Sequence, residues 1–306
     1  MPPAKPKIRC TSPLAAVTIG HMPWVLSDSL PDYSATAEGL VRARAVRNTI
    51  LLNVAETLRA RGPAAFGPDR PLFGWWLPPG TGAVGAAFLH TPPYPVVLTS
   101  MAAETAAELA PALASRRRAL GGVNADQPVA AAFAAAWHEL TGDAVEETMR
   151  SRLYQLGELK PPEPFPAGRG RVAGPDDRGL LIAWTQAFGQ EAHTVGDSTA
   201  LVDDRLSFRG YTLWEQAGQP VSVAGLSRQV AGQVRVGPVY TPREHRGRGY
   251  GGAVTWTVSQ AGRRAGAAEV VLFTDLANPV SNRLYERLGY QPVADRLVLA
   301  FRKRAR

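Results

Sequence analysis

The chain has 306 residues, 45% hydrophobic and 20% charged, which is typical of a folded globular protein long enough for two domains. Its single cysteine, Cys10, excludes an intramolecular disulfide and multi-cysteine metal sites. The five histidines are scattered without the spacing of metal ligands, so we expect no metal. The formal net charge is +8, which favours an anionic partner without naming one.

Much of the positive charge lies at the two ends of the chain, in residues 5–9 and 302–306. These segments lack the interleaved aromatic residues and the motifs of nucleic-acid binders, so we expect no nucleic-acid partner. No apolar run approaches the roughly 20 residues that a membrane-spanning helix needs. The N-terminus is broken by prolines and by Thr11-Ser12, which makes it a poor secretory signal, and a cytoplasmic protein is expected.

A proline-rich segment divides the chain. Four prolines between residues 161 and 166 stiffen the backbone, and glycines follow them. We therefore predict a basic tail (1–20), an Ala-rich N-terminal domain (21–160), a linker (161–170) and a C-terminal domain (171–306).

In the first domain, hydrophobic patterns predict strand-like runs around 73–76, 84–89 and 94–99. In the second domain, helical spacing is seen from residue 175 to 188, followed by short strands at 211–215, 221–226 and 233–241. A helix near 250–265, a strand at 269–274, a helix from 279 to 288 and a strand at 296–301 complete the chain. The alternation predicts an α/β (α+β) fold with a mixed sheet and flanking helices. Pro238 cannot donate to a β ladder, so Gly237-Pro238 marks an edge, a bulge or a splay in the third strand.

The segment REHRGRGYGG (243–252) lies between a predicted strand and a predicted helix. Its glycines let the backbone approach a ligand closely, and the helix start adds unpaired amides and the positive end of a dipole. Arg246 and Arg248 supply countercharge. The segment therefore predicts an anion cradle suited to a pyrophosphate.

The same residues contain Gly-x-Gly-x-x-Gly at Gly247, Gly249 and Gly252, with Asp275 ending the next strand. An NAD-binding Rossmann turn, however, places its first glycine directly after the strand, whereas residues 242–246 intervene here. The Gly-Pro pair also disfavours a central parallel strand. NAD binding is kept as the weaker alternative.

Two stretches, VYTPREHRGRGYGGA (239–253) and LFTDLANPVSNRLYERLGYQPV (272–293), resemble the GNAT superfamily of acetyl-CoA-dependent N-acetyltransferases. The first matches the family's Arg/Gln-x-x-Gly-x-Gly/Ala pattern through Arg246, Gly249 and Gly251. The resemblance covers about 170–306, and the whole chain is similar to actinobacterial two-domain members. It implies a tandem GNAT fold with a mostly antiparallel sheet, splayed central parallel strands in the C-terminal domain and a degenerate N-terminal copy. In that copy, residues 100–104 carry neither glycine nor arginine where the phosphate loop is expected.

The resemblance also implies roles for individual residues in binding acetyl-CoA. The pyrophosphate is expected on the loop, and the pantetheine arm and acetyl group on the third strand and on the start of the last helix. The implied binding residues are Val239, Tyr240, Thr241, Arg246, Gly247, Arg248, Gly249, Tyr250, Gly251, Gly252, Asn278 and Ser281.

Tyr285 is implied as the acid that protonates the departing CoA thiolate. A phenol has a pKa of about 10, so it is protonated at neutral pH and able to donate. Its place next to Leu284 predicts that it points away from the apolar stripe of Val280, Leu284 and Leu288. The general base is left open: Glu215 is the first candidate, Asp275 the second, and His193 and His245 follow.

The predicted function is transfer of an acetyl or acyl group from acetyl-CoA to a primary amine of a small molecule or peptide, by direct attack in a ternary complex. A non-catalytic, regulatory acyl-CoA-binding protein is the main alternative. The sequence does not decide between a monomer and a homodimer.

Overall fold

The computed structural model describes residues 24–116, 120–192 and 197–303, so the predicted tail (1–20) and His193 lie outside the described residues. The strands are β1 (Trp24–Ser27), β2 (Leu72–Trp76), β3 (Ala86–His90), β4 (Val96–Leu98), β5 (Gly122–Asp126), β6 (Ala144–Leu156), β7 (Arg169–Val172), β8 (Tyr211–Gln216), β9 (Gln219–Leu226), β10 (Gln233–Tyr240), β11 (Glu269–Asp275) and β12 (Tyr290–Arg302). The α-helices are α1 (Leu30–Thr36), α2 (Glu38–Ala43), α3 (Thr49–Arg61), α4 (Ala103–Ala114), α5 (Gln127–Thr141), α6 (Arg178–Glu191), α7 (Ser198–Ser207), α8 (Tyr250–Arg264) and α9 (Pro279–Arg287). Two 3₁₀ turns, η1 (Pro175–Asp177) and η2 (Arg243–His245), precede α6 and α8.

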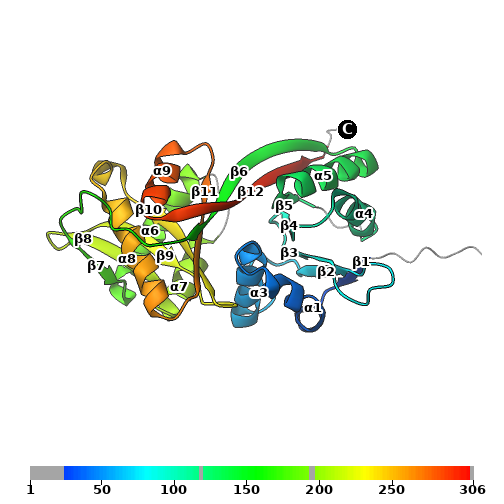
Figure 1. Cartoon of the computed structure of the whole chain (residues 1–306), viewed down its shortest axis with the longest axis horizontal. Helices are drawn as coiled ribbons and strands as arrows, with labels where there is room; N and C mark the ends of the chain where they lie inside the picture. Colours follow the sequence, from blue (N-terminus) through cyan, green and yellow to red (C-terminus); the bar gives the residue numbers. More distant parts are fainter. Residues whose placement is uncertain (1–23, 117–119, 193–196, 304–306) are drawn as a thin grey trace, which may run out of the picture.

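The described chain forms two halves that share one sheet (Figure 1). The strand order is β1-β2-β3-β4-β5-β12-β6-β11-β10-β9-β8-β7. In each half, four strands pair antiparallel and the fourth pairs in parallel with a fifth strand. The parallel pairs are β4 with β5 and β10 with β11. The predicted α/β fold with a mixed, mostly antiparallel sheet is therefore confirmed.

The two longest strands are exchanged between the halves. After α5, strand β6 crosses to the C-terminal half, where Ser151–Gln155 pairs with β11. Strand β12 returns at the end of the chain, where Arg296–Ala300 pairs with β5, and it also pairs with β6 from end to end. The strand predicted at 296–301 was therefore too short at its start, because a register shift at Pro292 and Ala294 breaks the apolar alternation there.

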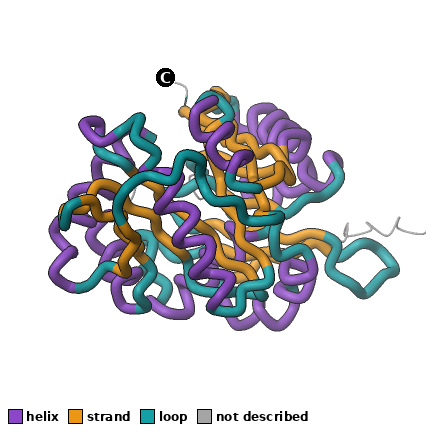
Figure 2. Tube along the Cα trace, turned by 60° about the vertical axis from the view of Figure 1, so that its left-hand side comes forward, coloured by secondary structure: helices purple, strands orange, loops and turns teal. Residues whose placement is uncertain are grey.

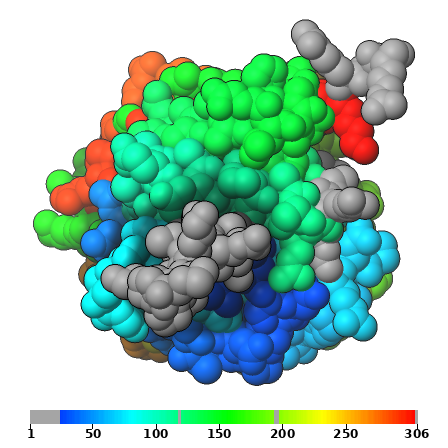
Figure 3. Space-filling view, turned by 90° about the vertical axis from the view of Figure 1, so that its right-hand side faces the viewer, coloured from blue at the N-terminus to red at the C-terminus, as the bar shows by residue number. Residues whose placement is uncertain are grey.

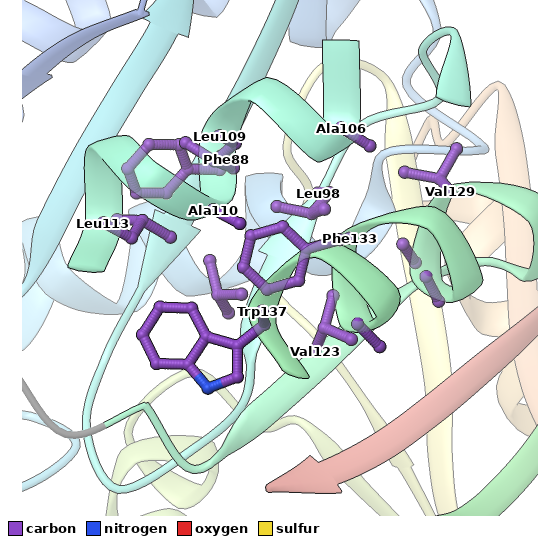
Figure 4. Close-up of a cluster of buried hydrophobic side chains, with 14 of the residues drawn as sticks. Phe88, Leu98, Ala106, Leu109, Ala110, Leu113, Val123, Val129, Phe133 and Trp137 are labelled. Carbon is purple, nitrogen blue, oxygen red and sulfur yellow. The ribbon is translucent and has the colours of Figure 1, made fainter. Parts of the chain in front are cut away.

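Helices cover both faces of the sheet (Figure 2). In the N-terminal half, α4 and α5 pack on one face and α1–α3 on the other; Figure 3 looks onto this end, with α4 and α5 in teal and green above the blue helices. Figure 4 shows how Phe88 and Leu98 from the strands meet Leu109, Phe133 and Trp137 from α4 and α5.

In the C-terminal half, α8 and α9 pack on one face of the strands, and α6 and α7 on the other. Within the described ranges, no helix combines the length and apolarity needed to cross a membrane.

Gly122 lies where β5 of the N-terminal half pairs with β12, and this pairing is called the seam between the halves. A Cβ at this position, whose φ is +153°, would overlap the Leu299 carbonyl oxygen on β12. We expect Gly122→Ala to lower the free energy of unfolding by about 3 kcal/mol, because rigid backbone has to move apart. The measurement is urea unfolding followed by fluorescence and circular dichroism.

Gly179→Ala on α6 is the matched control, since no atom of a described residue lies within 4 Å of the added Cβ. It should leave stability unchanged or raise it slightly. Equal stability of the two variants would contradict a tight β5–β12 seam.

Candidate functional site

The central parallel strands of the C-terminal half separate along their length. β10 pairs with β11 from Gln233 to Val236, and the pairing then stops. Beyond this point β10 stays with β9 across a register shift between Val236 and Val239, while β11 stays with β6 as far as Asp275. The predicted splay is confirmed, and Gly237-Pro238 occupies the irregular stretch where it opens.

The predicted anion cradle follows the opening. Gly247 and Gly249 have φ values of +75° and +81°, which glycine adopts without steric cost, and α8 begins at Tyr250. No hydrogen bond in the described chain uses the amides of Gly247 to Gly252. Free amide donors at a helix N-terminus are an arrangement that favours the binding of a phosphate or another anion.

The two arginines of the cradle have different surroundings. Arg246 donates to both carboxylate oxygens of Glu191, at 2.9 and 2.7 Å, and to the Thr241 carbonyl oxygen at 2.8 Å. Arg248 is exposed and forms no ion pair within the described ranges. Arg246 thus holds the loop against the end of α6, and Arg248 is the more available countercharge.

Close packing beneath the loop explains its other glycines. The Tyr250 hydroxyl donates to the Gln216 side chain, which anchors the first turn of α8. A Cβ on Gly252 would lie 3.0 Å from Leu284 of α9 and 3.6 Å from Pro162 of the linker. Gly252 therefore lets α8, α9 and the proline-rich segment meet at the cradle.

Tyr285 lies inside the hydrophobic core, although it was predicted to point away from the apolar stripe of its helix. Val280 is 75% exposed, whereas Tyr285 is 7% exposed and forms an edge-to-face contact with Tyr290 at 6.0 Å between ring centroids. The predicted apolar stripe was wrong at Val280, because the first turn of α9 projects into solvent. Burial raises the pKa of the Tyr285 phenol to about 12, so the hydroxyl keeps its proton at neutral pH.

The remaining predicted binding residues lie at the ends of β10 and β11. The side chain of Asn278 caps α9 by accepting from the Ser281 amide at 3.1 Å. Asp275, a candidate base, accepts from the Ala277 amide at 2.8 Å and so holds the loop before the helix. On the β10 side, the carbonyl oxygen of Tyr240 accepts from Ser222. Val239 lies on the stretch of β10 that has no strand partner toward β11.

Glu215, the first candidate base, is held by arginines. Its carboxylate accepts from Arg171 at 2.6 Å and lies 3.6 Å from Arg169, on the neighbouring strand β7. Arg171 also donates to Asp177 at the start of α6. The hydrogen bond from Arg171 holds the pKa of Glu215 below its usual value, which weakens it as a base. Glu215 does not line the cleft described next.

A cleft of about 730 Å³ reaches the point where β10 and β11 separate. Gly237, Pro238 and Phe273 are among the residues that line it. The C-terminal half contributes α6, α7 and the start of the β9–β10 turn, and the N-terminal half contributes α3 and the residues after it. Two arginines that line the cleft, Arg205 and Arg235, were not predicted from the sequence. The sequence offered one signal for Arg235, which is a charged residue between two valines of a predicted strand.

The corresponding place in the N-terminal half is closed. Arg296 of β12 is 3% exposed and donates to the side-chain and main-chain oxygens of Asn124 at 2.8 and 2.7 Å, and to the Leu98 carbonyl oxygen at 3.4 Å. It thereby connects the ends of β4 and β5, and α4 follows without a glycine loop.

Residues 180–290 match the model of the acetyltransferase (GNAT) family. A search of the curated proteins gives no match. Among solved structures, a GCN5-related N-acetyltransferase from Sphaerobacter thermophilus is similar with a TM-score of 0.58 and 18% identity, over 91% of this chain and 95% of that chain. A GNAT-family acetyltransferase from Colwellia psychrerythraea gives a TM-score of 0.57 and 11% identity, over 91% and 98%.

A tandem GNAT protein from the clavulanic acid biosynthesis pathway gives a TM-score of 0.54 and 15% identity, over 92% of this chain and 98% of that chain. At these identities the structures establish the fold alone, and the family model gives a match for residues 180–290. Residues 180–290 therefore resemble the GNAT acetyltransferase family, and the chain as a whole shares the fold of the tandem GNAT protein.

Proposed function

We propose that the protein transfers an acetyl group from acetyl-CoA to a primary amine by direct attack in a ternary complex. The observation that carries this proposal is the succession of three features along β10 and the loop after it. The cleft is lined by Gly237 and Pro238, the β10–β11 opening begins at the same residues, and the loop with the free amides of Gly247–Gly252 follows the end of β10.

In this arrangement the pyrophosphate binds the loop amides, with Arg248 as countercharge. The pantetheine arm runs along the open side of β10 past Thr241, Tyr240 and Val239, and near Asn278 and Ser281. The thioester then lies at the bulge, where the cleft admits the amine. The neutral amine attacks the thioester carbonyl, the C–S bond breaks, and the thiolate takes a proton from Tyr285 while the amine loses one to a base.

Binding stoichiometry tests the single site. We expect calorimetric titration with acetyl-CoA to give a value near one, because Arg296 closes the equivalent place in the N-terminal half. Gly249→Ala should weaken binding about tenfold, since alanine strains the +81° φ that aims the amides.

Gly218→Ala is the control for that strain. Gly218 has a φ of +77° in the β8–β9 turn and open space around it. This variant should bind acetyl-CoA like the parent protein. A stoichiometry near two, or equal losses in both variants, would contradict a single loop-based site.

The acid role of Tyr285 is tested by Tyr285→Phe, which removes the hydroxyl and keeps the ring contact with Tyr290. We expect kcat to fall about 100-fold or more, with acetyl-CoA affinity unchanged. Tyr290→Phe, whose hydroxyl contacts Ser259 at 2.6 Å in the core, should change stability and spare kcat. Acetyl-CoA binding without turnover in the parent protein would instead favour the regulatory alternative.

Glu215→Gln decides whether Glu215 is the base. Because Arg171 lowers the pKa of Glu215, its ion pairs stabilise the folded state above the ordinary carboxyl pKa of about 4.3 and are lost as the pH falls through the lowered value. We expect the variant to melt at a lower temperature at neutral pH, with the difference shrinking in acid, and kcat to change by less than about threefold. Loss of kcat by about 100-fold, together with loss of the acidic limb of the pH profile, would establish Glu215 as the base.

A further inference from the structure

Two arginine side chains line the cleft next to the bulge in β10. Arg205 comes from α7 and Arg235 from β10, immediately before Val236 and Gly237. Both line the cleft on the face of the sheet opposite α8, since the flanking Val234 and Val236 pack into the α8 core. The chain therefore places two positive charges where the acceptor amine has to approach.

Arg205 is fixed in place. It is 8% exposed, it donates to the Gly237 carbonyl oxygen, and its guanidinium lies 5.5 Å from the centre of the Tyr211 ring. A side chain on Gly225 would collide with this guanidinium, so the glycine makes room for it. These contacts use one face and one edge of the group and supply no negative charge.

Arg235 is half-buried and makes no side-chain hydrogen bond or ion pair with any described residue. Burial and the nearby Arg205 charge lower the pKa of Arg235 to about 10, so the group keeps its charge at neutral pH. An uncompensated guanidinium beside a second one is costly, because each charge has lost part of its hydration. A bound anion would compensate for the lost hydration and would reduce the repulsion between the two guanidinium groups.

The acidic residues that line the cleft are already engaged. Asp204 accepts from Arg228 at 2.8 and 2.9 Å, Asp197 caps α7 through the amides of Thr199 and Ala200, and Glu56 pairs with Arg59 at 3.3 Å. The segments outside the described ranges contain no Asp or Glu in their sequence. Neither arginine is thus matched by a carboxylate side chain of the described chain.

We propose that Arg235, positioned with Arg205, binds a carboxylate carried by the acceptor amine, so that the substrate class is amino acids or similar amine carboxylates. This assignment rests on the proposed acetyl transfer. A guanidinium presents paired N–H donors that match the two oxygens of a carboxylate. Because the arginines adjoin Gly237, the carboxylate lies within a few bonds of the amine that attacks the thioester.

Charges of both signs line the rest of the cleft: Glu56, Asp197 and Asp204 are acidic, and Arg61 and Arg228 are basic. Asp204 is paired with Arg228, whereas Asp197 forms no ion pair with a described residue and repels a dianion such as phosphate more strongly than a monoanion. Asp197 also attracts the ammonium of a zwitterion before it loses its proton. The cleft is thus bipolar, as an acceptor with one amine and one carboxylate requires.

The first test needs no turnover. Melting of the full chain is followed in acetate, phosphate or chloride at equal ionic strength and neutral pH. We expect acetate to raise the melting temperature of the parent protein and of Arg264→Met, an exposed arginine at the end of α8, but not of Arg235→Met. Equal responses in all three proteins would overturn the proposal, and a response to phosphate alone would overturn the choice of a carboxylate.

The second test follows CoA release with L-amino acids and their matched carboxamides as acceptors. The parent protein should prefer the acids more than about tenfold in kcat/KM, and Arg235→Met should lose about 10- to 100-fold on the acids alone. A preference for the amides, or one that survives Arg235→Met, would overturn the assignment.

Calorimetry with acetyl-CoA distinguishes a failure of the carboxylate site from a failure of the proposed acetyl transfer. Failure to bind acetyl-CoA would remove the proposed transferase function, whereas the acetate response would still report on the arginine pair. If acetyl-CoA binds and no amine on the panel reacts, the acetate response of Arg235→Met alone decides the carboxylate site.

Discussion

Backbone pairing across the exchanged strands β6 and β12 is the constraint on which the rest of the structure depends. The edge of a sheet carries unpaired N–H and C=O groups, and β5 and β11 would each present such an edge if their half stood alone. Each is covered by a strand that comes from the other half of the chain. Because β6 and β12 also pair with each other along their length, neither half completes its sheet without the other.

This exchange also makes the asymmetry of the two halves possible. In the C-terminal half, β6 holds β11 as far as Asp275, so β10 can diverge from β11 without leaving β11 unsupported. In the N-terminal half, β12 supports β5 in the same way but brings Arg296, whose hydrogen bonds connect β4 and β5. The same scaffold thus gives an open place in one half and a closed place in the other.

Local sequence determined what could be predicted. The glycine loop, the cap at Asn278 and the Gly-Pro irregularity in β10 are set by residues a few positions apart. Most strands and helices of the C-terminal half followed from their hydrophobic periods, but β7 and α7 were not predicted. The strand exchange and the pairing of Glu215 with Arg171, 44 residues away, depend on contacts that no local pattern encodes. The buried face of α9 was misjudged for a related reason: Val280 is exposed, whereas Tyr285 and Leu288 face the core beneath α8.

The closed N-terminal half still contributes to the site, because α3 and the residues after it form one wall of the cleft. Arg205 and Arg235 line the same cleft beside the bulge, and under the proposed function the acceptor passes between the two halves to reach the thioester. The proposed division of work follows from this geometry. The C-terminal half positions acetyl-CoA through main-chain groups, which recognise a cosubstrate of constant shape. The cleft between the halves selects the acceptor through side chains, which a sequence can change without disturbing the splayed strands.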